Sequence, residues 1–328
     1  MTASVLKRVF LYLLKGASLL LAVSVVTFML MSLSPIDPVQ VYVGAGTSIS
    51  PEQHEAIAQY WGLHEPPAGR FLAWLGALLR GDLGTSLIFR LPVSQVIAER
   101  ALDSLALMAT AWLLAGFIGF ALGTLAGAYH GHLPDQVIKS FCLTLSSTPP
   151  FWLGLILMIA FAAHLQLLPI GLAVPAGKLA ADVTFFDRLR HMILPALTLS
   201  IVGLPTIALH TRQKLIEVLH SDYCLFAFAR GQGKWAIIRR HGLRNTLLPA
   251  VTLQFASFAE LFGGSVLAEQ VFSYPGLGRT AVQAGLQGDM PLLLGITLFS
   301  ALFVFIGNSI ANALYGIFNP EIRSGSFG

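Results

Sequence analysis

The chain has 328 residues, of which 55% are hydrophobic and only 11% are charged. A typical soluble domain carries about 25% charged residues, so this composition excludes an ordinary soluble enzyme. The formal net charge of +4 is too small to indicate nucleic acid as a partner. The two cysteines, Cys142 and Cys224, indicate neither a disulfide framework nor a metal site.

Six apolar runs are long enough to cross a bilayer, whose hydrocarbon core requires about 20 apolar residues in a helix. We therefore predict an all-α, polytopic membrane protein with six transmembrane helices. The first run follows Lys7 and Arg8, but it is too long for a signal peptide and shows no cleavage site before Pro35, so we interpret it as a retained span. The runs cover residues 9–33, 102–129, 137–166, 192–219, 247–271 and 291–318.

The distribution of Lys and Arg predicts the orientation. If the N-terminus is cytoplasmic, that side of the membrane collects twelve of the 20 Lys and Arg residues. Four of the other eight lie in one long loop, where the positive-inside rule has little force. We therefore predict that both termini are cytoplasmic.

The spans divide the chain into four parts. Residues 1–33 form an N-terminal segment with the first span, 34–100 an extracytoplasmic region, 101–320 a transmembrane core of five helices, and 321–328 a C-terminal tail. The extracytoplasmic region contains helix signals, because Ser50 precedes Pro51 as a helix cap would. It also has an amphipathic stripe that either rests on the membrane surface or docks a partner. The stripe consists of Phe71, Trp74, Leu75 and Leu78.

Small residues recur at every fourth position along the second predicted span. Such a ridge lets another helix backbone approach closely, although Gly and Ala are also simply common in membrane helices. We predict a packing role for Gly119, Gly123 and Gly127. The whole ridge consists of Ala111, Ala115, Gly119, Gly123 and Gly127.

Three residues are candidates for lining a pore. Pro149 and Pro150 should break or kink the third span, and such breaks persist at membrane depth only where protein or a water-filled cavity satisfies the freed carbonyls. A purely structural bend is the alternative. Glu260 lies well inside the fifth span, where an acid is costly. It either lines a pore and favours a cationic solute, or hydrogen-bonds to a neighbouring helix.

No catalytic motif is present. The chain has no H-E-x-x-H, no G-x-S-x-G, no C-x-x-C and no P-loop. His130 and His132 flank a glycine in a predicted cytoplasmic turn, but a nearby third metal ligand is missing, so we interpret the turn as a solvated loop. We therefore predict a protein that is not an enzyme, with no metal site and no cofactor of its own.

Residues 222–249 read DYCLFAFARGQGKWAIIRRHGLRNTLLP and contain five basic residues against one acid, Asp222. This cytoplasmic stretch either anchors the chain to lipid headgroups or docks a soluble partner. Its apolar positions suggest short helices with one apolar face. These positions are Phe226, Ala227, Trp235, Ile238 and Leu243.

The stretch resembles the coupling motif of ABC-importer permeases of the dipeptide, oligopeptide and nickel family, in its first ("B"-type) subunit. That motif reads approximately D-Y-V-R-T-A-R-A-K-G-L, then about eight residues, then R-H-x-L-R-N-x-L-L-P. The chain departs from it at Leu225, Phe226, Phe228 and Gln232, where charge or polarity is lost. The resemblance implies that the stretch couples the permease to an ATPase. The implied coupling residues are Ala227, Ala229, Gly231, Arg240, His241, Leu243 and Arg244.

The likeness extends over nearly the whole chain. The turn from Tyr274 to Arg279 also matches the family, and its candidate gate residues either close the pore entrance outside, meet a binding protein, or only form a tight turn. These are Tyr274, Pro275, Gly276, Gly278 and Arg279. Other matching segments are Leu33–Pro38, Gly81–Ser86, Pro150–Gly154, Ile193–Ala196 and Asn319–Arg323.

The resemblance implies a type I ABC importer permease fold in the bacterial cytoplasmic (inner) membrane. It also implies a second paralogous permease subunit, two ABC ATPase subunits that bind ATP and Mg, a periplasmic or lipid-anchored solute-binding protein, and contact with membrane lipid. Family members import small peptides, nickel ions or metal chelates, and Glu260 favours a cationic or metal-bearing solute. The alternative is an ion-coupled secondary transporter that acts without ATPase subunits, which would usually show more intramembrane acids and internal repeats.

Overall fold

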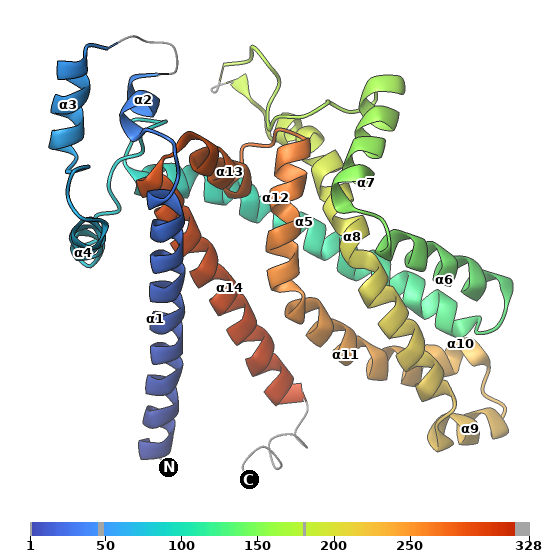
Figure 1. The fold of residues 1–328 in the computed structure, drawn as a ribbon. Coiled ribbons are helices and arrows are strands. Elements are labelled where there is room, and N and C mark those ends of the chain that lie inside the picture. Colours follow the sequence, from blue (N-terminus) through green and yellow to red (C-terminus); the bar gives the residue numbers. More distant parts are fainter. Residues whose placement is uncertain (1, 45–48, 180–181, 319–328) are drawn as a thin grey trace. The chain divides into compact units, whose positions relative to one another are not determined.

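The computed structural model describes residues 2–44, 49–179 and 182–318 (Figure 1). In these ranges the regular structure is helical, and no strand occurs beyond an isolated bridge between Thr85 and Pro92. Four of the described helices can cross a membrane alone, and there are six spans if each of two bent helix pairs is one span. The prediction of an all-α protein with six spans is confirmed. The predicted match at Asn319–Arg323 and the predicted tail 321–328 lie outside the described residues.

Two predicted spans are broken helices. The third span consists of α6 (Leu133–Ser146) and α7 (Pro150–Leu157), which continues as a π-helical turn, and the two parts are bent by 108°. The break follows from Pro149 and Pro150, since Pro149 is extended and Pro150 begins α7. The fifth span is bent by 56° between α11 (Leu243–Ala256) and α12 (Phe258–Val271).

Two other predicted boundaries were wrong. The second span is α5 (Val93–Ala128), which begins before residue 102, and the fourth is α8 (Phe185–Leu219), which begins before residue 192. Polar residues in the first turns of both helices concealed these starts. Thr184 caps α8 in a capping box with Asp187. This motif marks the start of a helix, but a prediction based on hydropathy does not use it.

One compact unit contains the residues up to Asp103 together with Gly276–Phe305. Its core joins the start of α5 to α13 and α14 through residues such as Val93, Leu277 and Leu292. Asp289 is fully buried, and its carboxylate accepts hydrogen bonds from Ser86 Oγ at 2.6 Å and from the Ile88 amide at 3.0 Å. The helices that lie wholly in this unit are α1 (Thr2–Ser32), α2 (Pro38–Val43), α3 (Pro51–Tyr60), α4 (Pro67–Leu78) and α13 (Leu277–Gln287), and α14 (Met290–Phe318) begins in it.

The predicted helix signals after the first span are confirmed. Ser50 caps α3 in a capping box with Gln53, and Asp37 caps α2 by accepting from the Val39 amide. His54 Nε2 lies 2.6 Å from Asp37 Oδ2, which joins α3 to the start of α2. Although partial burial opposes it, these hydrogen bonds lower the pKa of Asp37 below its ordinary value.

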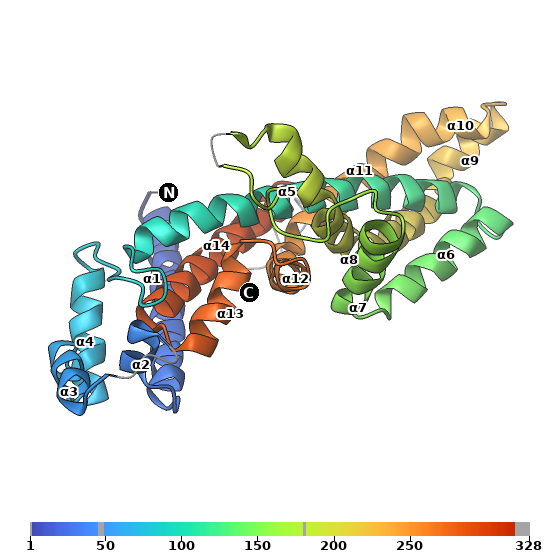
Figure 2. The same ribbon diagram turned by 90° about the horizontal axis from the view of Figure 1, so that it is seen from above.

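The second compact unit contains Ser104–Pro275 and the chain from Ile306 onward. The long helix α8 is its centre, and α6, α7, α11 and α12 all pack against α8 (Figures 1 and 2). The glycines of α5 lie against the same helix. A Cβ atom built on Gly119 would lie 3.0 Å from the Leu204 carbonyl oxygen, and one on Gly127 would lie 3.0 Å from that of Arg212. A Cβ atom on Gly123 would overlap the Ala208 carbonyl oxygen, so at this position the approach of the two backbones requires glycine.

Candidate functional site

The basic stretch folds into two short helices and a tight turn at the C-terminal end of α8 (Figure 1). These are α9 (Asp222–Ala229), α10 (Lys234–Ile237) and the π-helical turn Ile238–Gly242, which leads into α11. Gly231 ends α9 with a positive φ of 81°. The Gly231 amide donates to the Phe228 carbonyl and the Gln232 amide to the Ala227 carbonyl, which is a Schellman motif.

The inner side of α9 fixes the stretch to the rest of the unit. Cys224 and Ala227 are buried against Val218 of α8 and Ile237 of α10. The next residue, Ile238, is buried against the C-terminal ends of α5 and α8. Because a packed core of this kind resists deformation, α9 and the end of α8 form one packed element.

The outer side of α9 exposes large apolar side chains. Phe226 is 63% exposed, and three more exposed residues of α9 are Tyr223, Leu225 and Phe228. The expectation of one apolar face was wrong, because Phe226 and Trp235 are exposed whereas Ala227 and Ile238 are buried. The stretch has an apolar side that packs inward and another that points outward. We call Tyr223, Leu225, Phe226 and Phe228 the outer apolar surface.

The same stretch exposes positive charge, and one of its arginines contacts the outer apolar surface. Arg230 lies over the Phe226 ring at 5.8 Å and Lys234 over the Tyr129 ring at 5.5 Å. Within the described ranges, no ion pair with a carboxylate engages any of the five basic residues of the stretch. These exposed residues are Arg230, Lys234, Arg239, Arg240 and Arg244. Aromatic side chains with Arg neighbours are typical of the anchors of protein interfaces.

The predicted coupling residues occupy three environments. Ala227 is buried in the inner core, and its position gives it a packing role. His241 and Leu243 are half-buried, and the His241 ring lies 5.9 Å from that of Tyr223. The remaining four are exposed, namely Ala229, Gly231, Arg240 and Arg244.

Sequence reasoning missed a buried ion pair near this stretch. Asp135 of α6 is buried and accepts two hydrogen bonds from Arg212 of α8, from Nε at 2.5 Å and from Nη2 at 2.7 Å. The Gly131 amide donates to the same carboxylate at 2.9 Å, and His130 Nδ1 lies 3.3 Å from it. Both His130 and His132 are exposed, but His130 is part of a network that holds the α5–α6 turn to α8. The acid in the first turn of α6 was the available signal.

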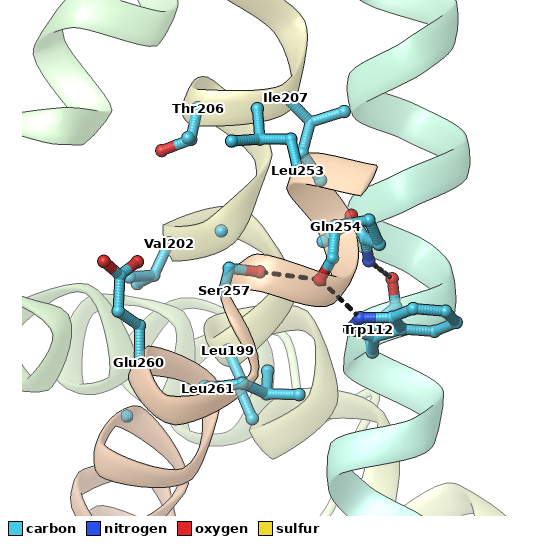
Figure 3. A pocket seen from close by; sticks show the side chains of 13 residues that line it. Trp112, Leu199, Val202, Thr206, Ile207, Leu253, Gln254, Ser257, Glu260 and Leu261 are labelled. Atoms are coloured by element: carbon cyan, nitrogen blue, oxygen red, sulfur yellow. Dashed lines mark hydrogen bonds between the residues drawn. The ribbon is translucent and has the colours of Figure 1, made fainter. Parts of the chain in front are cut away.

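Glu260 lies at a cavity of about 80 Å³ where α11 meets α12 (Figure 3). Ser257 occupies the break between the two helices, and its hydroxyl donates to the Gln254 carbonyl at 3.0 Å. The cavity is also lined by Trp112 of α5 and Thr206 of α8. In Figure 3 the Glu260 carboxylate lies beside the turn of α8 that carries Val202 and Thr206.

The other pore candidates do not join Glu260. Neither Pro149 nor Pro150 lines this cavity; they form the break between α6 and α7. The predicted gate turn crosses the boundary of the two compact units, which falls between Pro275 and Gly276.

The two parts of the gate turn are largely buried. In the second unit, Tyr274 packs against Leu107 and Ala196, while Pro275 is half-buried. In the first unit, Gly276 precedes α13, Gly278 is buried and Arg279 is half-buried. Among the described residues, no group of three His, Cys, Asp or Glu side chains could hold a metal ion.

Comparison with known proteins adds a family match that covers most of the chain. Residues 119–324 match the profile described as binding-protein-dependent transport system inner membrane component, and residues 3–94 match the N-terminal profile of such membrane components. The oligopeptide transport system permease protein AppB of Bacillus subtilis (strain 168) is 33% identical over 324 residues, which cover 98% of this chain and 100% of AppB. The dipeptide transport system permease protein DppB of Escherichia coli (strain K12) is 32% identical over 321 residues, covering 92% of this chain and 94% of DppB.

A solved structure shares the fold. A chain from inward-facing conformations of the MetNI methionine ABC transporter superposes with a TM-score of 0.50 at 17% identity. The match covers 67% of this chain and 97% of that one. At this identity the likeness shows a common fold, the type I permease fold of ABC importers, and nothing about the solute.

Proposed function

The chain belongs to the family of binding-protein-dependent transport system inner membrane components, and we propose that it carries peptides as one of two permease subunits of an ABC importer. It is a multi-pass protein of the inner membrane and a permease subunit of an ABC transporter. The observation that carries the peptide assignment is full-length similarity to permeases named for oligopeptides and dipeptides. Nickel ions or metal chelates are the second candidate class, favoured only by the acid at Glu260.

The outer apolar surface and the exposed arginines of the same stretch would dock the permease on an ATPase subunit. Four exposed apolar side chains beside five positive charges fit a groove with an apolar floor and an acidic rim. Two such ATPase subunits would bind ATP and Mg, which accounts for the absence of a P-loop in this sequence. Since α9 packs on α8, closure of the ATPase pair would rotate the spans as a rigid body and switch the path between inward-open and outward-open.

The remaining partners follow from the same assignment. A second paralogous permease subunit would complete the path, and a periplasmic or lipid-anchored solute-binding protein would deliver and select the solute. Docking of α9 on an ATPase places this end of α8 in the cytoplasm, which gives a cytoplasmic N-terminus. Tyr274, Gly276 and Arg279 then lie near the outer face as gate or docking residues.

Reconstitution of the whole transporter tests the proposal. The chain, its permease partner, the ATPase subunits and the binding protein are assembled in proteoliposomes, and peptide uptake and ATP hydrolysis are measured together. We expect vanadate-sensitive uptake, and Phe226→Asp should prevent co-purification of the ATPase. Leu79→Asp is the matched control, because Leu79 is 82% exposed and lies at the end of α4, outside the spans.

Two results would contradict this assignment. Uptake by the chain without ATPase subunits, unaffected by vanadate, would favour an ion-coupled secondary transporter. Nickel uptake without peptide uptake would be consistent with an ABC importer but would contradict the assignment of peptides as its solute.

A further inference from the structure

Helix α8 carries a polar stripe that hydropathy alone does not reveal. Thr206, His210, Gln213 and Glu217 follow one another at intervals of four, three and four residues, which places them on one face of the helix. All four are exposed in the chain. The last two residues of the stripe are joined by a hydrogen bond, in which Gln213 Nε2 donates to Glu217 Oε1 at 3.4 Å.

This face cannot lie against lipid tails. Thr206 and His210 lie within about 12 Å of the middle of the 35-residue helix, given a rise of about 1.5 Å per residue. Polar and ionisable groups at that depth face protein or a water-filled cavity. A stripe that continues to Glu217 at the end of α8 has the length and direction of a water-filled path toward the basic stretch.

A second helix, α12, also has an exposed face that cannot lie against lipid tails. Ala259, Glu260 and Gly263 are exposed there, so the Glu260 carboxylate is uncovered by its own chain in the middle of a span. An uncovered carboxylate is costly in hydrocarbon and must therefore meet water or another polar group. Thr206 and Glu260 line the same cavity, which joins the two polar faces.

Most of the residues that line the cavity are apolar, and Glu260 is the one charged residue among those that the structure describes there. Gln254 is only 6% exposed, and its Oε1 accepts no hydrogen bond from any residue that the structure describes. Its Nε2 is already used, because it donates to the Trp112 carbonyl. The described lining includes neither Lys nor Arg to neutralise Glu260. In Figure 3 the Gln254 side chain is turned toward Trp112 and away from Glu260, so the Glu260 carboxylate is the group of this cavity that suits a ligand with positive charge.

We propose that Glu260 and the stripe from Thr206 to Glu217 line the translocation path, and that Glu260 binds the primary ammonium group of the solute. In a peptide this is the α-ammonium, a cation with three hydrogen-bond donors. The inference rests on the proposed function, and it names the chemical group that the path itself recognises.

Thiol labelling tests both water access and charge. Thr206→Cys is introduced, and the assembled transporter is treated with a trimethylammonium-ethyl or a sulfonatoethyl methanethiosulfonate. We expect Thr206→Cys to react, and to favour the cationic reagent about tenfold relative to a free thiol in solution. Phe117→Cys, at an apolar position that is 74% exposed on α5, should react with neither reagent. The wild-type chain gives the background, because its two cysteines are buried.

Removal of the charge completes the test. Glu260→Gln should reduce the reagent preference of Thr206→Cys to within about twofold of the free thiol, and Glu260→Asp should retain most of it. Unreactive Thr206→Cys in an active transporter, or equal rates for the two reagents, would overturn this inference and leave the proposed function intact. A chain that assembles with no ATPase would instead overturn the proposed function.

Discussion

Trp112 and Gln254 hold α5 to α11 through a reciprocal pair of hydrogen bonds. The Trp112 indole Nε1 donates to the Gln254 carbonyl at 2.9 Å, and Gln254 Nε2 donates to the Trp112 carbonyl at 2.6 Å. The main-chain carbonyl of Gln254 also accepts a hydrogen bond from the Ser257 hydroxyl. Ser257 lies between the end of α11 and the start of α12. The Trp112 and Ser257 side chains therefore satisfy the Gln254 main-chain carbonyl at the bend. Inside a membrane such a carbonyl needs a partner, because lipid tails offer no hydrogen bonds.

Gln254→Leu should destabilise the transporter. The substitution removes one of the two hydrogen bonds that join α5 to α11, which costs about 0.5–1.5 kcal/mol. We expect a lower thermal unfolding midpoint for the purified complex. Gln95→Leu is the control, because Gln95 is an exposed residue that bonds only to Glu99. Equal midpoints for the two variants would contradict a structural role for the pair.

Gly231→Val should uncouple ATP hydrolysis from transport. A φ of 81° is strained for a β-branched residue by roughly 1–2 kcal/mol, so the Schellman turn that orients α9 should rearrange. We expect normal membrane insertion and less uptake per ATP hydrolysed. Gly233→Val is a matched control, because Gly233 has a φ of −66° and equally open surroundings. If the substrate-stimulated ATPase rate and uptake both stay normal in Gly231→Val, the coupling role is rejected.

Gly123→Leu should separate α5 from α8. A Cβ atom at this position would lie 2.7 Å from Thr211 Cβ, closer than side chains pack, and the Ala208 backbone is also in the way. We expect a loss of folded protein, read as aggregation in size-exclusion chromatography. Gly203→Ala probes the facing helix, where the new Cβ would make an ordinary 3.5 Å contact with Ala115. A monodisperse Gly123→Leu protein would show that the two helices are not in contact.

The broad fold could be predicted because it depends on local signals. Run length and hydropathy identified the spans, and Pro149–Pro150 identified the bend of the third. The bend of the fifth span was not predicted, because Ser257 is no helix breaker and its effect depends on partners from α5. The start of α5 was missed because its first turns, from Val93 to Arg100, carry enough polar residues to lower the hydropathy.

The candidate site was accessible to sequence reasoning only in part. The glycine of the α9 turn and the exposed arginines follow from sequence, because turns and charge are local properties. Which apolar residues of α9 point outward depends on how it folds back on α8, and a helix of eight residues is too short to reveal this by periodicity. The partner of Arg212 was likewise hidden, since Asp135 lies 77 residues away in the chain.

Asp135→Asn should destabilise the part of the second unit where the start of α6 packs against α8. Asp135 is buried and bidentate to Arg212, and removing one partner of a buried pair costs about 3–5 kcal/mol because the remaining charge is uncompensated. The thermal midpoint of the complex should fall, and Arg212→Gln in the same chain should restore part of it. The matched control on α8 is Glu217→Gln, which breaks an exposed pair with Lys214 and should cost less than about 1 kcal/mol. If the double variant is no more stable than Asp135→Asn alone, the uncompensated charge of Arg212 is not the cause of the loss.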